Sequence, residues 1–141
     1  GELYALLSRH SVLRHSLAGA GRELDGDAFL DGVRSSDALP SALFKVRTAS
    51  LLRGATPDWC RSFLDGLLVG SELRSLPRTA PIVLCAASGL AASYRLALEE
   101  LGIAKGALTQ ILPAAVERLA PIGHARLLQS TAEPPAAGPA D

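Results

Sequence analysis

The sequence predicts a mostly helical α/β domain with a short parallel sheet, and three observations support this fold class. Residues 82–86 form a continuous apolar run, which is typical of a strand covered on both faces. A turn of small residues at 87–89 then leads into a helical pattern over residues 90–101. Alanine and leucine are abundant and aromatic residues make up only 4% of the chain, which favours helix elsewhere.

The composition excludes several classes of partner. With 141 residues, the chain can form one domain with a sizeable core. Its formal net charge is zero, so it lacks the electrostatic footprint of proteins that bind nucleic acid or an anionic membrane. It shows no signal-peptide pattern and no long uncharged apolar run, so we expect a cytoplasmic protein that does not span a membrane.

The sulfur-containing residues add two expectations. Cys60 and Cys85 lie in apolar segments without a motif partner, so we expect a reduced, buried pair rather than a disulfide. The chain opens on Gly1 and contains no methionine, so we expect a piece of a longer protein or a processed product.

The N-terminal segment, residues 2–15, is predicted to be one amphipathic helix whose inner face carries Leu3, Leu6, Leu7 and Leu13. His10 and His15 have no Cys, Asp or Glu at metal-ligand spacing, so they are predicted to be solvated or to cap a helix. Glycines within residues 16–23 indicate a flexible connection.

Two more helices are predicted next. Asp25 or Asp27 can cap a helix over residues 28–35, and Pro40 opens another that ends at Gly54. Their apolar positions are Phe29, Leu30 and Val33 in the first and Leu43, Phe44, Val46 and Leu51 in the second. The second also carries Lys45, Arg47 and Arg53, a pattern typical of a solvated face. Arg47 is singled out as a candidate because apolar residues flank it.

A long helix over residues 57–76 has the strongest start signal in the chain. Thr56 supplies a capping hydroxyl, Pro57 fits the first helical position and Asp58 places an acid in the first turn. The helix contains Gly66 and Gly70, each of which costs about 1 kcal/mol relative to alanine. Either another helix packs tightly against them or a ligand approaches, and the sequence leaves both alternatives open.

The strand at 82–86 and the helix at 90–101, which ends at Gly102, form a unit that could contact a nucleotide. Its turn lets backbone N–H groups approach a phosphate, although the glycine pattern is too sparse for a fingerprint. A second strand is predicted over residues 107–112, parallel to the first. Two strands make a poor sheet, so partner strands are expected from a second copy or from an absent N-terminal part.

The C-terminal segment is predicted to contain one more helix and a tail. Pro121 favours a helix start near Ala120 over one unbroken helix. That helix is expected to pack on the sheet through Ile122, Ala125, Leu127 and Leu128. Residues 130–141 are rich in Pro, Ala and Gly and are expected to be disordered, which leaves a domain over residues 1–129.

Four stretches, in order, resemble the C-terminal half of the 2-dehydro-3-deoxygalactonokinase family. They are Gly1-Glu2-Leu3 with HSVL at 10–13, FKVRT at 44–48, FLDGLLVGSEL at 63–73, and the strand–turn–helix unit at 82–94. The resemblance covers residues 1–102 well and the last helix loosely. This family is similar to sugar kinases of the actin-like ATPase superfamily, so the chain is expected to be an incomplete ribonuclease-H-like C-terminal lobe.

The resemblance also implies an activity. The family's reaction is the ATP-dependent phosphorylation of 2-dehydro-3-deoxy-D-galactonate at its 6-hydroxyl. Mg²⁺ is implied as well as ATP, because phosphoryl transfer needs its charge neutralised. The aspartate-glycine phosphate loop of the first lobe is not in this chain, so we expect the chain to be inactive alone.

By the same resemblance, several residues are assigned to the nucleotide and the sugar acid. The turn that contacts adenosine is Ala86, Ala87, Ser88 and Gly89, and the helix residues facing the cleft are Gly66, Gly70, Ser71 and Glu72. Glu2 remains from a turn near the cleft, and Arg47 offers a fork of donors for the substrate's acid group or a phosphate. No catalytic residue and no metal ligand is assigned.

Two alternatives to an enzyme remain open from the sequence. The chain can be a helical module that mediates association through its open sheet edge. It can also be a nucleotide-binding regulatory domain that uses the same turn without a phosphoryl acceptor. The ordered motif matches favour the kinase.

Overall fold

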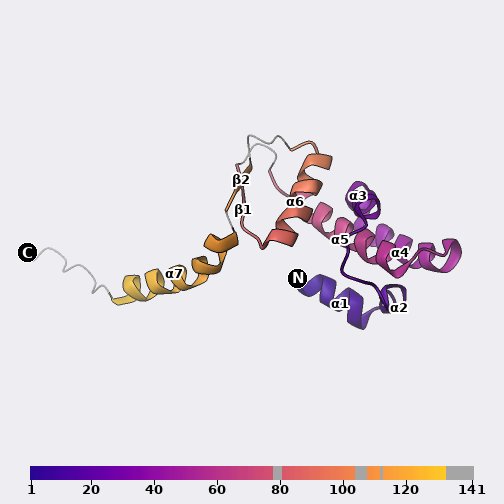
Figure 1. Cartoon of the computed structure of the whole chain (residues 1–141), viewed down its shortest axis with the longest axis horizontal. Coiled ribbons are helices and arrows are strands. Elements are labelled where there is room, and N and C mark those ends of the chain that lie inside the picture. Colours follow the sequence, from indigo (N-terminus) through magenta and orange to yellow (C-terminus); the bar gives the residue numbers. More distant parts are fainter. Residues whose placement is uncertain (78–80, 104–107, 112, 133–141) are drawn as a thin grey trace, which may run out of the picture.

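The computed structural model describes residues 1–77, 81–103, 108–111 and 113–132. The chain is mostly helical and contains one short parallel sheet, as predicted (Figure 1). Its elements in chain order are α1 (Glu2–His10), α2 (Arg14–Leu17), α3 (Gly26–Arg34), the 3-10 helix η1 (Ser35–Ala38), α4 (Leu39–Arg53), α5 (Pro57–Arg74), β1 (Ile82–Leu84), α6 (Ser88–Glu100), β2 (Leu108–Gln110) and α7 (Pro113–Ala132).

Helix α5 is the element around which the rest of the chain packs. It begins as predicted, because the Thr56 hydroxyl accepts a hydrogen bond from the Trp59 amide at 3.2 Å. One buried cluster joins it to α2, α3 and α4, through residues that include Leu13, Leu17, Ala28, Val46, Cys60 and Leu64. A second cluster joins it to α3 and α6, through Phe29, Val33, Leu73, Ala97 and Leu98.

The glycines of α5 allow α3 to lie against its backbone. A Cβ atom at Gly66 would overlap the Phe29 carbonyl oxygen, and one at Gly32 would overlap the Phe63 carbonyl oxygen. A Cβ at Gly70 would lie 2.7 Å from the Ser36 hydroxyl oxygen. Of the two alternatives that the sequence left open for Gly66 and Gly70, the structure shows the tightly packed helix.

The N-terminal segment is not the single helix that we predicted. It breaks after α1, where the Ser11 hydroxyl donates to the Leu7 carbonyl oxygen at 2.5 Å and accepts from the Leu13 amide at 3.1 Å. These bonds satisfy backbone groups that the break would otherwise leave unpaired. The change of direction buries Leu13, whereas Leu3 and Leu6 are exposed, contrary to the predicted inner face.

Helices α3 and α4 begin and end close to where the sequence indicated. Asp25 caps α3 by accepting from the Ala28 amide at 3.0 Å, and α4 ends at Gly54, whose φ is +63°. The predicted inner face of α4 is wrong in part. Phe44 and Leu51 are exposed, because the face turned to α5 consists mainly of Ala42, Val46 and Ala49.

The sheet has the predicted parallel pairing, with Ile82 opposite Leu108 and Leu84 opposite Gln110. Its strands are three residues each, shorter than expected. The expected burial on both faces is not found: Leu84 is buried but Val83 is 59% exposed. Cys85, beyond the end of β1, is also exposed, so only Cys60 of the expected buried pair is buried, and both cysteines are free.

Helix α7 departs from two predictions. It runs unbroken from Pro113 to Ala132 with Pro121 in its interior, rather than starting near Ala120. It projects away from the body (Figure 1), and its apolar residues are exposed instead of packing on the sheet: Ile122, Ala125, Leu127 and Leu128. The proline therefore lies in a helix that few neighbours constrain. Of the tail expected from residue 130, residues 130–132 continue α7 and the remainder lies outside the described residues.

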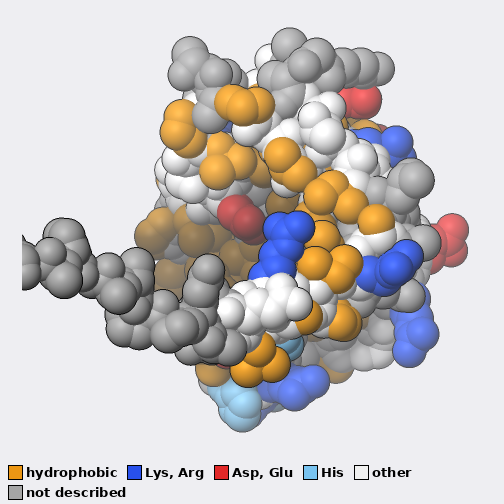
Figure 2. Space-filling model, turned by 90° about the vertical axis from the view of Figure 1, so that its left-hand side faces the viewer, with side chains coloured by type: hydrophobic (Ala, Val, Ile, Leu, Met, Phe, Trp, Pro, Cys, Tyr) orange, Lys and Arg blue, Asp and Glu red, His pale blue; other side chains and the backbone are white. Residues whose placement is uncertain are grey.

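The view toward the end of the molecule that carries α7 shows hydrophobic side chains spread over the surface, with charged ones between them (Figure 2). Across the described residues, the large apolar side chains that are more than half exposed are Leu3, Leu6, Val12, Phe44, Leu51, Leu52, Val83, Leu90, Leu127 and Leu128. Within the ranges given above, no helix is both long and apolar enough to cross a membrane.

Candidate nucleotide site beside Glu72 and Tyr94

Two hollows meet at Glu72, near the C-terminal end of α5. One has a volume of about 280 Å³ and is lined by Gly1, Leu3, Tyr4, Leu39, Leu68, Ser71 and Glu72. The other has a volume of about 270 Å³ and is lined by Glu72, Leu73, Leu76, Ile82, Val83, Leu84, Cys85, Ala86, Leu90 and Tyr94. The start of α1, the last turns of α5, strand β1 and the first half of α6 therefore surround one carboxylate.

Glu72 is held by a tyrosine from the neighbouring helix. The Tyr94 hydroxyl donates to Glu72 Oε2 at 2.6 Å. Burial of Tyr94, followed by this hydrogen bond and the charge of Glu72, raises the pKa of Tyr94 to about 12. The phenol therefore stays protonated at neutral pH and fixes the carboxylate, whose other oxygen can accept a hydrogen bond from a ligand hydroxyl.

Glu72 is among the residues assigned by the resemblance, whereas Tyr94 is not. A buried tyrosine hydroxyl usually needs a hydrogen-bond partner, and the chain has only two tyrosines. The low number of tyrosines is the one sequence feature that draws attention to Tyr94. It does not show which acceptor the Tyr94 hydroxyl contacts.

The structure brings together part of the predicted set. Of the four helix residues assigned to the cleft, Ser71 and Glu72 line one hollow, together with Gly1. Gly66 and Gly70 are not with them, because they are buried against α3 and η1. Glu72 follows Gly70 by two residues, which is a rotation of about 200° around the α5 axis. The two residues therefore lie on nearly opposite faces of the helix.

The predicted adenosine turn lies at the far end of the second hollow. Ala86 lines that hollow, and Ala87 precedes α6 in an extended conformation without a side-chain cap. Ser88 and Gly89 form the first turn of α6 and are exposed. A Cβ at Gly89 would meet nothing within 4 Å. The turn thus presents uncapped N–H groups and the positive end of a helix to open space, a combination that suits an anion.

Arg47 and Glu2, the predicted substrate residues, line neither hollow at Glu72 and border two different hollows, although Glu2 lies between Gly1 and Leu3 of the first hollow. The Arg47 Nη1 atom is 3.5 Å from the Ser16 hydroxyl oxygen, and its side chain borders a mainly apolar hollow with Val12, Leu43 and Phe44. Glu2 is exposed and borders another hollow with Leu6 and His10. Neither hollow includes Glu72.

An acidic group that sequence reasoning did not select lies near the first hollow. Burial raises the pKa of Asp65, while Arg61 and the N-terminal amine oppose that rise. Arg61 Nη1 contacts Asp65 Oδ2 at 3.1 Å, and its other terminal nitrogen donates to the Glu23 carbonyl oxygen. Burial and the charge of Asp65 also raise the pKa of Tyr4, which lines the hollow.

The described residues do not by themselves form a metal centre. In these segments, no group of three or more His, Cys, Asp or Glu side chains could hold a metal ion. Glu72 is the sole carboxylate among the residues lining its two hollows. Mg²⁺ is usually held by one or two carboxylates together with substrate phosphates, so this site offers at most one protein ligand.

Comparison with known proteins agrees with this architecture. Residues 1–118 match the family described as DGOK, 2-keto-3-deoxy-galactonokinase. Over 112 residues, 73% of the chain, the sequence is 36% identical to the Rhizobium meliloti (strain 1021) protein named "Probable 2-dehydro-3-deoxygalactonokinase DgoK1". Over 112 residues, 72% of the chain, it is 34% identical to the 2-dehydro-3-deoxygalactonokinase of Escherichia coli (strain K12).

A solved structure is similar as well. A crystal structure from Sinorhizobium meliloti, whose description names a 2-dehydro-3-deoxygalactonokinase protein, superposes with a TM-score of 0.73 at 28% identity. The match covers 91% of this chain and 44% of that one, and the matched segment is 37% of each curated relative. On the match over residues 1–118, the chain belongs to the 2-dehydro-3-deoxygalactonokinase family.

Proposed function

We propose that this chain supplies the nucleotide-binding side of a kinase that transfers the γ-phosphoryl group of ATP to the 6-hydroxyl of 2-dehydro-3-deoxy-D-galactonate. One observation supports the proposal: Glu72, Tyr94 and Ala86, the first residue of the turn, line one hollow, and that hollow lies within the residues that match the family. An apolar wall with a few fixed polar groups and an uncapped helix start suits an adenine nucleotide.

The residues of this hollow have distinct roles in the proposal. The turn formed by Ala86, Ala87, Ser88 and Gly89 contacts the adenosine, where the absence of a side chain at Gly89 gives it room. Leu76 and Leu90 provide apolar surface for the base. Glu72, held by Tyr94, accepts a hydrogen bond from a ribose hydroxyl. Ser71 extends the polar edge into the first hollow.

The remaining components come from the resemblance. Mg²⁺, when bound with ATP, neutralises phosphate charge, and most of its ligands belong to residues other than those described. Arg47 is proposed to meet the carboxylate of the sugar acid or a phosphate, and Glu2 to lie near the cleft. In this structure neither residue lines the hollows at Glu72.

The chain is proposed to be an incomplete ribonuclease-H-like lobe that does not catalyse the reaction alone. The matched segment is just over a third of the curated relatives' length, and Val83 leaves one face of β1 uncovered. The rest of the kinase, or a second copy of the chain, would cover that face. A cytoplasmic location is part of the same proposal.

The proposal is tested by ATP binding and turnover, measured separately. We expect calorimetry to detect ATP binding to the purified chain, and Gly89→Val to weaken that binding at least fivefold by filling the open turn. Gly54→Val, at another exposed glycine, is a poor control because its φ is +63°, so Ala92→Val on the exposed side of α6 is used instead. Unchanged affinity in Gly89→Val would contradict the assignment of the turn.

Turnover tests the second part. With ATP, Mg²⁺ and 2-dehydro-3-deoxy-D-galactonate, we expect the isolated chain to release no ADP above background. Measurable substrate-dependent ADP release would contradict the claim that the chain is inactive alone. ATP binding without turnover would support the combined proposal.

Association without catalysis is a second candidate function. It is favoured by exposed apolar side chains on separate parts of the surface, including Phe44 on α4 and Val83 on β1. A chain that binds no ATP but assembles through these residues would support this alternative.

A further inference from the structure

A hollow of about 360 Å³ lies between α3, α4 and α5 and shares no lining residue with the two hollows at Glu72. Its lining residues are Asp31, Arg34, Ser35, Lys45, Thr48, Ala49, Arg53, Trp59 and Phe63. Three of them are cations and one is an acid. This surplus of positive charge is notable in a chain whose formal net charge is zero.

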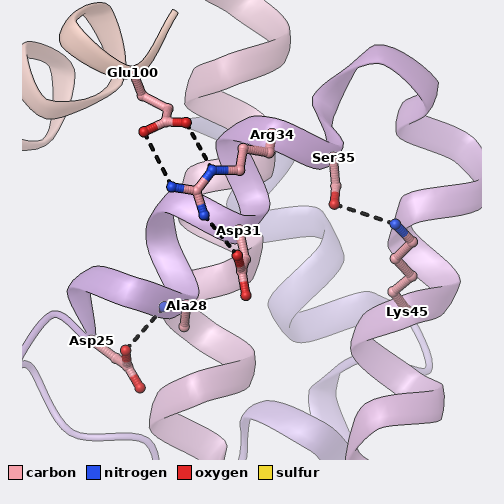
Figure 3. A network of polar contacts seen from close by, with 7 residues as sticks. All are labelled: Asp25, Ala28, Asp31, Arg34, Ser35, Lys45 and Glu100. Carbon is pink, nitrogen blue, oxygen red and sulfur yellow. Dashed lines mark hydrogen bonds and ion pairs between the residues drawn. The ribbon is translucent and has the colours of Figure 1, made fainter.

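One of the three cations, Arg34, is already paired with two carboxylates, so this network carries a formal net charge of −1. Arg34 Nη1 donates to Asp31 Oδ1 at 3.0 Å. Two other nitrogens of the same guanidinium donate to Glu100 of α6, Nε to Oε1 at 2.7 Å and Nη2 to Oε2 at 3.3 Å (Figure 3). Asp31, the acidic residue among those lining the hollow, is therefore already paired with Arg34. The Arg34 network ties α3 to α6 and leaves Lys45 and Arg53 as the charges available to a ligand.

Lys45 and Arg53 lack acidic partners among the described residues. The Lys45 ammonium donates to the Ser35 hydroxyl at 3.3 Å, a neutral acceptor that leaves its charge uncompensated (Figure 3). Arg53 forms no ion pair or side-chain hydrogen bond in the described part of the chain. The two residues are eight positions apart on α4, so their Cα atoms are separated by about 12 Å along the helix axis.

The space between the two cations has an apolar wall. Trp59 and Phe63, one turn apart on α5, stack with their ring centroids 4.9 Å apart and their planes inclined by 15°. Phe63 is buried, so it holds the half-buried Trp59 ring in place. Thr48 lies on α4 between the two cations, and its hydroxyl donates to the Lys45 carbonyl oxygen at 3.3 Å, so it lines the hollow without offering a free donor. The hollow therefore has two cations from α4, spaced along the helix axis, and an aromatic wall from α5.

We propose that this hollow binds a small organic anion with two negatively charged groups separated by a carbon chain, such as a phosphorylated sugar acid. One charged group meets Lys45 and the other meets Arg53, whose guanidinium can bind a carboxylate or phosphate through two nitrogens. The carbon chain packs along the Trp59 ring. This site is separate from the proposed nucleotide site and does not depend on it.

Trp59 is the chain's sole tryptophan, so its fluorescence reports directly on this hollow. We use four probes: 6-phosphogluconate, which has charges at both ends of a six-carbon chain; 3-phosphoglycerate, which is shorter; and gluconate and inorganic phosphate, which lack one end. We expect a saturable change with 6-phosphogluconate, weaker binding of 3-phosphoglycerate, and at least tenfold weaker binding of the other two. Calorimetry under the same conditions detects binding that leaves the fluorescence unchanged.

Substitutions test the two ends. Lys45→Gln and Arg53→Gln are each expected to weaken 6-phosphogluconate binding at least fivefold, and the double variant to abolish it. Arg95→Gln removes an exposed cation from α6 and is the matched control, with unchanged affinity expected. Circular dichroism checks that α4 is retained in every variant.

Three results would overturn the proposal: no saturable binding by either method, equal affinity for 6-phosphogluconate and inorganic phosphate, or unchanged affinity in the double variant. Failure here is distinguishable from failure of the nucleotide site. ATP binding is assigned to the turn at Gly89, and Lys45 and Arg53 take no part in it.

Discussion

At the scale of the residue, two groups of the same chemical type have opposite exposure and opposite uses. Gly66 is buried where the backbone of another helix approaches, whereas Gly89 faces open space before α6. The sequence places Gly66 inside a helix and Gly89 in a turn of small residues, but it does not show what surrounds either one. The structure shows that Gly66 is needed for helix packing, whereas Gly89 has open space around it.

The Tyr94–Glu72 pair leads to a prediction about alkaline titration. In a Tyr4→Phe background, which leaves Tyr94 as the single tyrosine, we expect the phenol to ionise with a pKa of about 12. Adding Glu72→Gln should lower that pKa toward the ordinary value, because the carboxylate charge and its strong acceptor are removed. Absorbance at 295 nm measures both transitions, and equal pKa values in the two variants would contradict the pairing.

The same pair affects stability at high pH. Because the folded-state pKa of Tyr94 is raised above its unfolded value, its contribution is fully present below about pH 10 and is lost as the pH rises through about 12. The free energy of unfolding should therefore fall more steeply over this range in the original chain than in Tyr94→Phe. Urea unfolding at a series of pH values measures the difference, and parallel pH profiles would show that the pair contributes nothing.

At the scale of the element, the contact between α3 and α5 brings the backbones of the two helices directly together. It depends on glycines in both helices, Gly32 in α3 and Gly66 and Gly70 in α5. The intrinsic penalty of a glycine in a helix is about 1 kcal/mol, and here the packing of Phe29 and Val33 offsets it.

Gly66→Ala should show how much this packing contributes. The added methyl group would collide with the backbone of Phe29, so we expect a loss of about 2–3 kcal/mol in the free energy of unfolding, or failure to fold. Gly89→Ala is the matched control, because its methyl group meets open space and gains helix propensity. Urea unfolding compares the two, and a loss of similar size in both variants would contradict the packing account.

Strand β1 allows a second comparison at this scale. Leu84→Ala should lower the free energy of unfolding by about 2–4 kcal/mol, because the side chain is only 7% exposed. Val83→Glu, one residue earlier and on the uncovered face, should change it by less than about 0.5 kcal/mol. If Val83→Glu were as destabilising as Leu84→Ala, β1 would be covered on both faces in this chain after all.

At the scale of the whole molecule, the chain has two clusters of buried residues and a surface with many exposed apolar side chains. A two-stranded sheet with one bare face is rarely stable by itself. The match to just over a third of the relatives' length offers a physical reason, because an incomplete lobe would leave such faces uncovered.

Concentration-dependent association follows from this surface. We expect the isolated chain to form dimers or larger species as its concentration rises, and Val83→Glu to shift it toward monomer by placing a charge on the bare face of β1. Phe44→Gln, at a similarly exposed apolar residue on α4, should have a smaller effect. Sedimentation velocity measures both, and equal effects would indicate non-specific apolar contact rather than pairing at the sheet.

Local signals made several elements predictable from the sequence. Thr56 and Pro57 mark the start of α5, Asp25 caps α3 and Gly54 ends α4, because caps and left-handed ends depend on residues a few positions apart. The parallel pairing of two strands around a helix also followed from the order of elements. The ordered stretches that resemble the family are likewise a property of the sequence alone.

The tertiary structure decided what depends on residues far apart in the chain. Tyr94 meets Glu72 across 22 positions, and Gly66 meets the backbone of α3 rather than a ligand. Exposure of Val83 and Cys85 depends on which strands and helices are present to cover them, and apolar character alone could not reveal that. The sequence by itself determined the family and the places where α3, α4 and α5 begin and end. The partners of each face were decided by packing, because burial is a property of the assembled elements and not of any one segment.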